Sequence, residues 1–70
     1  MQTGVEITVN GKPRRVPIGT TLAGLVADCG LDRVAVAVER NHALVRSKDR
    51  AAVTLAEGDE IEVVTLVGGG

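Results

Sequence analysis

Few residues in this sequence are of a type that could support chemistry. Gly68, Gly69 and Gly70 stand together at its end, Cys29 is the only thiol and His42 is the only imidazole. Glycine loses more backbone freedom on ordering than any other residue, so a run of three is a poor structural element. Without side chains, such a run can enter a channel barely wider than the backbone. Three residues at about 3.3–3.6 Å each reach roughly 10 Å beyond a folded body.

The carboxyl group of Gly70 is the group through which this chain could react. A carboxylate is inert to nucleophiles, but a partner enzyme can convert it with ATP into an acyl-adenylate, from which a sulfur donor displaces the nucleotide. The product is a thiocarboxylate, and its attachment to the chain raises its effective concentration at an acceptor. In this hypothesis Gly68 and Gly69 thread the partner's active site, and the chain is not itself an enzyme. The alternative is a frayed terminus or the remnant of a tag.

Other reactive residues are expected to take no part. Cys29 lies on the apolar face of a predicted helix, where a cysteine usually behaves as a small hydrophobic residue. His42 has no acidic or cysteine neighbour at ligand spacing, so we expect a solvated side chain and no metal site. The cluster Arg46, Lys48 and Arg50 is interpreted as a solvated loop rather than a binding patch. No catalytic triad, phosphate loop or zinc motif is present.

The composition excludes several classes of function. The chain has 70 residues, no aromatic residue and a formal net charge of −1, so it lacks both stacking platforms and a basic footprint for nucleic acid. A single cysteine cannot form an internal disulfide, which suits a reducing compartment. The sequence shows no secretory signal and no apolar run near the ~20 residues that span a bilayer. We therefore expect a cytoplasmic protein without nucleic acid or membrane partners.

The first half of the chain predicts a hairpin. Apolar residues alternate with polar ones from Val5 to Val9, which indicates a half-buried strand. Asn10-Gly11 follows, a strong hairpin signal because both residues tolerate positive φ. The return strand, residues 12–17, contains two prolines and is therefore predicted at the edge of a sheet.

A short helix is predicted next. Thr20 or Thr21 supplies the N-cap, an apolar stripe runs as far as Cys29, and Gly30 provides the left-handed C-terminal cap. These signals allow about two turns. Gly24 lies inside the helix, where we expect it to permit a close approach between helix and sheet.

Three more strands are predicted in the second half. Residues 33–40 form a valine-rich run that suits a central strand, and Asn41-His42 turns the chain into a short strand over 43–45. After a tight turn at 57–59, the last strand runs over 60–67.

This order of elements is typical of an α+β, ubiquitin-like β-grasp fold, a mixed sheet of four to five strands packed on one helix. We expect the domain over residues 1–67 and a flexible glycine tail over 68–70. Val64 and Leu66 alternate with the core-facing residues of the last strand and should point outward. Exposed apolar side chains beside a reactive tail suggest a docking surface, although a neighbouring element could equally cover them.

Several segments of the sequence match a known pattern. They are Ile7-Thr8-Val9-Asn10-Gly11, Thr20-Thr21-Leu22, Val36-Ala37-Val38 with Asn41, Leu55-Ala56-Glu57-Gly58-Asp59-Glu60-Ile61-Glu62-Val63-Val64, and Val67-Gly68-Gly69-Gly70. Through these segments the chain resembles the sulfur carrier proteins of thiamine biosynthesis. The resemblance implies adenylation of Gly70 by an E1-like adenylating and sulfur-transfer enzyme. It further implies conversion of Gly70 to a thiocarboxylate, delivery of the sulfur to thiazole synthase and no bound cofactor beyond the ATP that the partner uses. Two positions depart from the family: Leu66 stands where Phe is frequent, and His42 stands where Gly is frequent.

Other functions share parts of this pattern. The small subunit of molybdopterin synthase has the same fold and a Gly-Gly thiocarboxylate, and carriers for cysteine or tungsten-cofactor synthesis are similar. A ubiquitin-like modifier would be joined to lysines, and such modifiers often have Arg just before Gly-Gly, where Val67-Gly68 stands here. A regulatory interaction domain with a disordered tail would keep its activity without Gly69 and Gly70, whereas a carrier would lose it.

Overall fold

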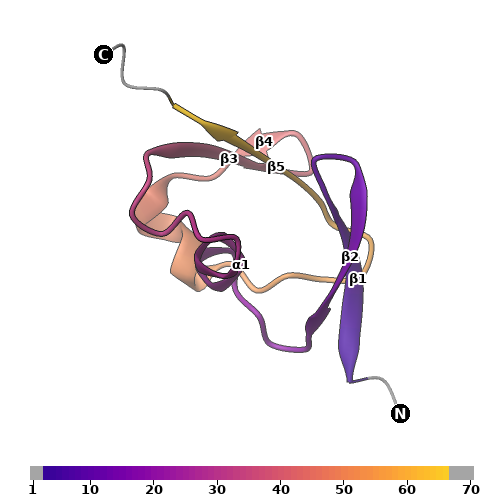
Figure 1. The fold of residues 1–70 in the computed structure, drawn as a ribbon. Helices are drawn as coiled ribbons and strands as arrows, with labels where there is room; N and C mark the ends of the chain where they lie inside the picture. The colour runs from indigo at the N-terminus through magenta and orange to yellow at the C-terminus, as the bar shows by residue number, and fades with distance from the viewer. Residues whose placement is uncertain (1–2, 67–70) are drawn as a thin grey trace.

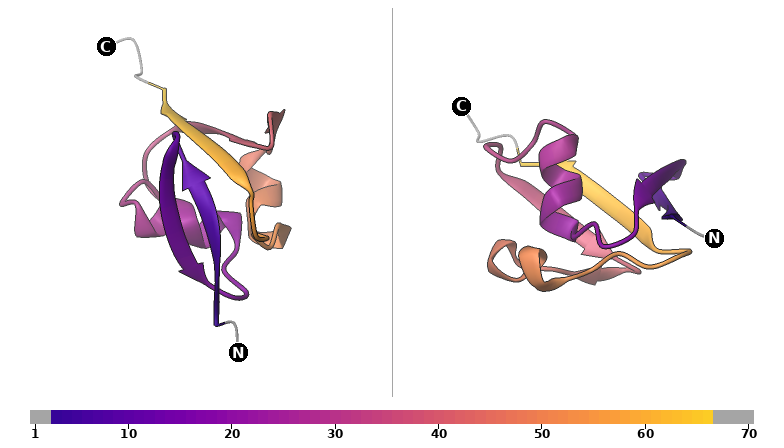
Figure 2. Two further views of the ribbon diagram at one scale, coloured as in Figure 1. Left: turned by 90° about the vertical axis from the view of Figure 1, so that its right-hand side faces the viewer. Right: turned by 90° about the horizontal axis from the view of Figure 1, so that it is seen from below.

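A computed structural model describes residues 3–66 of the chain. Its elements, in order, are β1 (Gly4–Val9), β2 (Lys12–Pro17), α1 (Leu22–Asp28), β3 (Val36–Arg40), β4 (Ala43–Leu44), the 3₁₀ helix η1 (Ser47–Ala52) and β5 (Glu60–Thr65). The strands form one sheet in the order β2-β1-β5-β3-β4, with β1 parallel to β5 and the other neighbours antiparallel. Helix α1 lies across one face of this sheet (Figures 1 and 2). The predicted mixed sheet on one helix is confirmed.

The predicted hairpin is confirmed. Asn10 and Gly11 have φ values of 52° and 81°, which build the tight turn between β1 and β2. Val9 pairs with Lys12, and β2 lies at the edge of the sheet. The prolines of β2 therefore remove no hydrogen bond from the interior of the sheet.

Helix α1 is capped at both ends by the predicted residues. The Thr21 side chain accepts a hydrogen bond from the Gly24 backbone N–H at 3.1 Å. At the other end Gly30 has a φ of 77°, and the Leu31 backbone N–H donates to the Val26 carbonyl at 3.1 Å. This hydrogen bond closes a six-residue turn that ends the helix after two turns. It also brings Leu31 back against the core.

The expected reason for Gly24 is wrong. A Cβ atom at this position would meet Thr21 Oγ1 at 3.4 Å and Thr20 Cγ2 at 3.9 Å, which are ordinary contacts within the cap. The helix therefore has space for a methyl group at Gly24, and the sheet does not approach it closely there.

The valine-rich strand lies in the interior of the sheet, as predicted, but it is shorter than predicted. Strand β3 begins at Val36 because the preceding segment continues the turn after α1, where the Val34 N–H donates to the Leu31 carbonyl at 3.1 Å. β5 takes the middle position, as the β-grasp pattern requires of the last strand, and pairs with β1 on one side and β3 on the other. The predicted last strand also ends earlier, at Thr65.

The interpretation of residues 46–50 as a solvated loop is wrong for Arg50. Arg46 is the N-cap of η1, and Lys48 and Arg50 lie within it. Arg50 is half-buried, and it donates from Nη2 to the Val36 carbonyl at 3.0 Å and from Nε to the Val45 carbonyl at 3.3 Å. β4 ends at Leu44, so in the described residues no strand pairs with Val36 on the side away from β5. A backbone carbonyl there needs a donor, and Arg50 provides it.

The core is entirely aliphatic and lies between the sheet and α1. Its buried members are Ile7, Val16, Leu22, Leu25, Val26, Val36, Val38, Leu55 and Ile61. They come from β1, β2, α1, β3, the segment after η1 and β5, so one cluster joins distant parts of the chain. None of the helices in residues 3–66 has the length and apolar character needed to cross a membrane.

The burial of a leucine side chain should decide how much it contributes to the free energy of unfolding. Leu25→Ala removes a fully buried side chain of α1, and we expect it to lower the free energy of unfolding by about 2–5 kcal/mol. Leu44→Ala makes the same chemical change at a side chain that is 66% exposed, and should change it by less than about 0.5 kcal/mol. Urea denaturation followed by circular dichroism measures both. Equal losses would contradict the described core.

Candidate functional site

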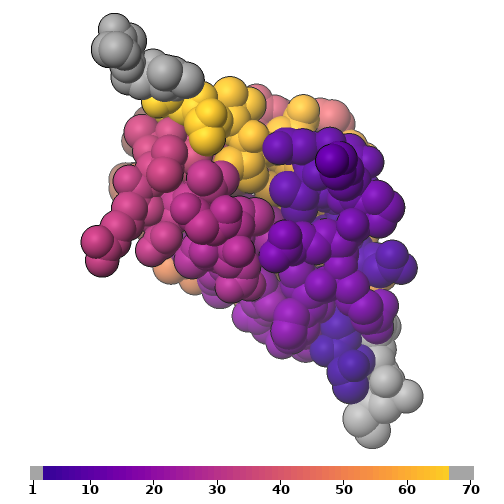
Figure 3. Space-filling view, in the orientation of Figure 1, coloured from indigo at the N-terminus to yellow at the C-terminus, as the bar shows by residue number. Residues whose placement is uncertain are grey.

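Of the predicted site residues, the structure describes Val64 and Leu66 but not the three glycines. Gly68, Gly69 and Gly70 lie outside the described residues, so the site is analysed through β5, the strand that leads to them. Val64 and Leu66 are 59% and 54% exposed, as predicted. In Figure 3, β5 reaches the surface between the β1–β2 hairpin and the chain that follows α1.

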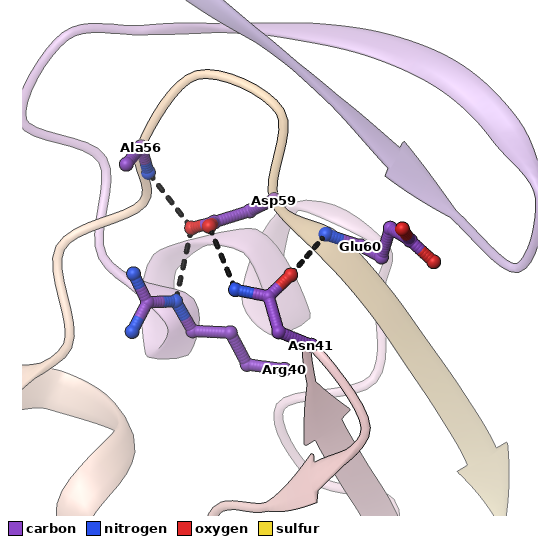
Figure 4. Close-up of polar contacts among 5 residues, drawn as sticks. All are labelled: Arg40, Asn41, Ala56, Asp59 and Glu60. Atoms are coloured by element: carbon purple, nitrogen blue, oxygen red, sulfur yellow. Dashed lines mark hydrogen bonds and ion pairs between the residues drawn. The ribbon is translucent and has the colours of Figure 1, made fainter.

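The beginning of β5 is fixed by a buried carboxylate. Asp59 is 5% exposed, and its Oδ2 accepts hydrogen bonds from Arg40 Nε at 2.9 Å and from the Ala56 backbone N–H at 2.8 Å. Its Oδ1 accepts from Asn41 Nδ2 at 3.1 Å. Asn41 in turn accepts from the Glu60 N–H at 2.9 Å (Figure 4). The network ties the first residue of β5 to the β3–β4 turn.

These partners also set the charge of Asp59. Burial alone would raise the pKa of this carboxyl group, but the hydrogen bonds from the Ala56 N–H, Arg40 and Asn41, with the positive charge of Arg40, lower it further than burial raises it. The pKa of Asp59 therefore lies below its ordinary value. A charged carboxylate with a full set of donors favours one arrangement of the strand and the turn.

Farther along β5, the side chain of Asn10 makes the hydrogen bonds that a neighbouring strand would otherwise make. β1 ends at Val9, and Asn10 then donates from Nδ2 to the Val63 carbonyl at 3.1 Å and accepts from the Val63 N–H at 2.8 Å. Its backbone N–H also donates to the Ile61 carbonyl at 2.9 Å. Sequence reasoning found Asn10 only as a turn residue. A side-chain amide can make both bonds of a strand neighbour, so Asn10 extends the ladder by one residue.

Beyond Val63, the neighbour of β5 in the described region is the start of β3. Ala37 pairs with Val64, and the Leu66 N–H donates to the Ala35 carbonyl at 2.8 Å. These alanines are small, so the side chains of Val64 and Leu66 stand above their neighbours on the outer face of the sheet.

A groove lies beside this apolar surface at the edge of β3. It has a volume of about 580 Å³ and is lined by Val34, Leu44 and Leu66 together with Arg46 and Arg50. The groove exists because β4 pairs with only two residues of β3. Apolar side chains of a partner could occupy it next to the point where the chain leaves β5.

Cys29 belongs to a different part of the molecule. It is half-buried at the C-terminal cap of α1 and packs against the core, in agreement with the predicted core position. Arg14 Nη1 lies 3.9 Å from its sulfur. Among the described residues, Cys29 therefore contacts the core and Arg14 and not the end of β5, from which the tail continues.

The surroundings of His42 differ from the prediction. Its side chain is 74% exposed, but Nε2 lies 3.5 Å from Glu60 Oε1 and Nδ1 lies 3.9 Å from Glu62 Oε2. One ligand atom each from Glu39, His42 and Glu62 lie within 4.8 Å of one another. Glu60 and Glu62 could not be found from sequence spacing, because the pairing of β5 with β3 brings them to His42.

Comparisons with known proteins agree over most of the chain. A family model described as the ThiS family matches residues 7–70. A thiazole synthase of Magnetococcus marinus is 47% identical, and one of Paramagnetospirillum magneticum is 35% identical, each over 66 residues. Each match covers 94% of this chain, which spans only about a fifth (20%) of the length of these curated relatives. The crystal structure of a thiamine biosynthesis protein, ThiS from Geobacter metallireducens, has a TM-score of 0.79 and 29% identity, and the match covers 94% of this chain and all of that one.

The charge of Asp59 should give stability a defined dependence on pH. The folded-state pKa lies below the unfolded value of about 3.9, so the stabilisation is complete above that value and is lost as pH falls through the folded-state pKa. We expect Asp59→Asn to lower the free energy of unfolding by about 2–4 kcal/mol at neutral pH, because Arg40 and the Ala56 N–H lose a charged acceptor.

Urea denaturation between about pH 2.5 and pH 7 measures this contribution. The difference between the wild type and Asp59→Asn should shrink below about pH 4. Asp28→Asn, at the exposed end of α1, is the matched control and should change stability little. A difference that stays constant over the whole pH range would contradict a stabilising charge on Asp59.

Proposed function

The chain belongs to the ThiS family, the sulfur carriers of thiamine biosynthesis, and from this premise we propose that Gly70 is the residue that carries the sulfur. One observation supports this assignment most directly: the family match extends through the glycine run as far as Gly70. The β-grasp fold predicted from the sequence is that of the solved ThiS protein. The carrier function predicted from the tail therefore has a matching fold and a matching family.

The proposed chemistry uses only the terminal carboxyl group of this chain. An oxygen of the Gly70 carboxylate attacks the α-phosphorus of ATP, and pyrophosphate leaves. Hydrosulfide then attacks the acyl carbon, AMP leaves with the electron pair of the C–O bond, and loss of the S–H proton gives the thiocarboxylate anion. The resulting thiocarboxylate keeps its sulfur on Gly70 until an acceptor takes it. An E1-like enzyme would supply the ATP site and the sulfur, while Gly68 and Gly69 let the tail pass into that site.

We propose thiazole synthase as the acceptor of this sulfur. The two relatives that bear this name contain a region like the present chain within a protein about five times longer. Joining a carrier to its acceptor raises the effective concentration of one at the other. The chain itself would provide recognition and the carrying group, and its partners would provide catalysis. Because activation consumes ATP, we place the reaction in the cytoplasm.

The surface around the end of β5 would dock the E1-like enzyme. Val64 and Leu66 are exposed, and Leu66 also lines the groove beside β3. Apolar side chains next to the tail would hold the folded body outside the enzyme while the glycines reach its active site. Anchoring of β5 by Asp59 and Asn10 would keep these side chains at a fixed distance from Gly70.

Removal of the last two glycines should abolish activation. In an ATP–pyrophosphate exchange assay with the E1-like enzyme, a chain lacking Gly69 and Gly70 should give no exchange above background, because the reacting carboxyl group no longer reaches ATP. Cys29→Ser should exchange at the wild-type rate and still accept sulfur. Circular dichroism confirms folding of both variants. Exchange by the shortened chain, or loss of sulfur transfer in a folded Cys29→Ser variant, would exclude the assigned roles.

Docking should depend on where an exposed apolar side chain lies. Val64→Asp should weaken binding to the E1-like enzyme about tenfold or more, since it buries a charge against an apolar surface. Ile18→Asp makes a comparable change at a side chain that is also 59% exposed, but on the loop between β2 and α1. It should leave affinity within about twofold. Titration by isothermal calorimetry distinguishes the two, and equal affinities would refute the docking role of Val64.

A further inference from the structure

Two asparagines bind β5 from opposite sides in the same way. Asn10 begins the turn between β1 and β2, Asn41 begins the turn between β3 and β4, and their φ values are 52° and 51°. Each donates its backbone N–H to a carbonyl of β5, Asn10 to Ile61 at 2.9 Å and Asn41 to Glu60 at 2.8 Å. Each also accepts through Oδ1 from a backbone N–H of β5, Asn10 from Val63 and Asn41 from Glu60. The two turns therefore hold the central strand at different points along its length.

The remaining hydrogen bonds of the two asparagines differ in their surroundings. Asn41 Nδ2 donates to the buried Asp59 at the start of β5, where a charge without donors would be costly (Figure 4). Asn10 Nδ2 donates to the Val63 carbonyl at 3.1 Å, and this bond is exposed. Water could replace Asn10 as the partner of Val63 at an exposed position. The bonds of Asn10 are therefore not needed to satisfy a buried group, and their particular contribution is geometric.

The hairpin turn by itself does not require asparagine. Gly and Asp suit the first position of a turn with positive φ as Asn does. Of these three residues, only Asn has both an N–H donor and a carbonyl acceptor in its side chain. Asn10 uses one of each on the same residue, Val63. The presence of Asn at position 10 is thus explained by its contact with β5 as well as by the turn.

These two bonds, called the Asn10 clamp below, decide how far β5 is held from both sides. The backbone of the first hairpin binds β5 only as far as Ile61, and the clamp moves this limit to Val63. Beyond Val63, the described neighbour of β5 is the segment at the start of β3, where the Leu66 N–H donates to the Ala35 carbonyl. A strand segment bonded on one side opens more readily than one bonded on both sides.

We propose that Asn10 is a positioning residue for the reaction of Gly70, because the clamp at Val63 fixes the direction in which the chain leaves the sheet. This inference rests on the proposed function and separates two roles within it. Val64 and Leu66 would bring carrier and enzyme together, whereas Asn10 would set how often the carboxyl group then meets ATP. A small rotation of β5 displaces the end of the tail more than it displaces the strand. Misplacement of a reacting group by about 1 Å can lower a rate about 10²-fold.

Hydrogen exchange tests the clamp without any enzyme. Asn10→Gly removes both side-chain bonds but keeps a residue that adopts positive φ. The Leu66 amide should then exchange with deuterium about tenfold faster than in the wild type, as measured by NMR, because the end of β5 opens locally. Asn41→Gly is the matched control on the other side of the strand. It should destabilise the fold at least as much, since Asp59 loses a donor, yet leave exchange at Leu66 within about twofold.

The ATP–pyrophosphate exchange assay tests the positioning role. Asn10→Gly should lower kcat about tenfold and leave the KM for the carrier within about twofold, because docking is kept and alignment is lost. Asn10→Asp also suits the turn, but it turns a carboxylate oxygen toward the Val63 carbonyl, so kcat should fall there too. Asn41→Gly should keep kcat within about twofold. A residue that only stabilises the fold would not separate kcat from KM in this way, and circular dichroism confirms that each variant is folded.

Two outcomes would overturn the proposal. A wild-type kcat in folded Asn10→Gly and Asn10→Asp variants would show that the clamp does not position the tail. Equal losses of kcat in Asn10→Gly and Asn41→Gly would show that the general stability of β5 is what matters. In both cases the wild type is still activated, so the proposed function stands. Absence of exchange by the wild type would instead reject the proposed function, and this inference with it.

Discussion

The position of β5 is the constraint on which the rest of the structure depends. This strand leads to the glycines, yet it must also run through the centre of the sheet, parallel to β1 and antiparallel to β3. No hairpin can build a parallel pair, so β5 is separated from β1 in the chain by a long connection that contains α1, β3, β4 and η1. The charged carboxylate of Asp59 fixes its first residue by bonds to Arg40, Asn41 and Ala56. The Asn10 side chain then holds it at Val63.

Local signals in the sequence predicted much of this fold. The Asn10-Gly11 turn, the Thr21 cap and the Gly30 stop depend on residues a few positions apart, and each lies where the pattern placed it. Strand alternation likewise predicted that Val64 and Leu66 are exposed. The role of the tail stays a prediction from its composition and from the resemblance, because Gly68, Gly69 and Gly70 lie outside the described residues.

Interactions between distant residues explain what the sequence did not reveal. Asp59 could be recognised as part of a turn, but the side chains that donate to it, Arg40 and Asn41, lie 19 and 18 residues away. Arg50 looked like a solvated cation because nothing local shows that β4 ends early and leaves the Val36 carbonyl to be bonded. The carboxylates around His42 come from two strands whose register is set by packing.

The central claim is that Gly70 carries sulfur, and intact-mass and fragment-ion analysis of the protein from its own cells tests it most directly. Exchange of one terminal oxygen for sulfur adds nearly the same mass as one oxidation at Met1 or Cys29, so fragments must locate the added mass. The account predicts that the added mass lies on Gly70 and that it disappears when Gly70 is deleted. A Gly70 that is always a free acid, or that is joined to lysines of other proteins, would contradict the account.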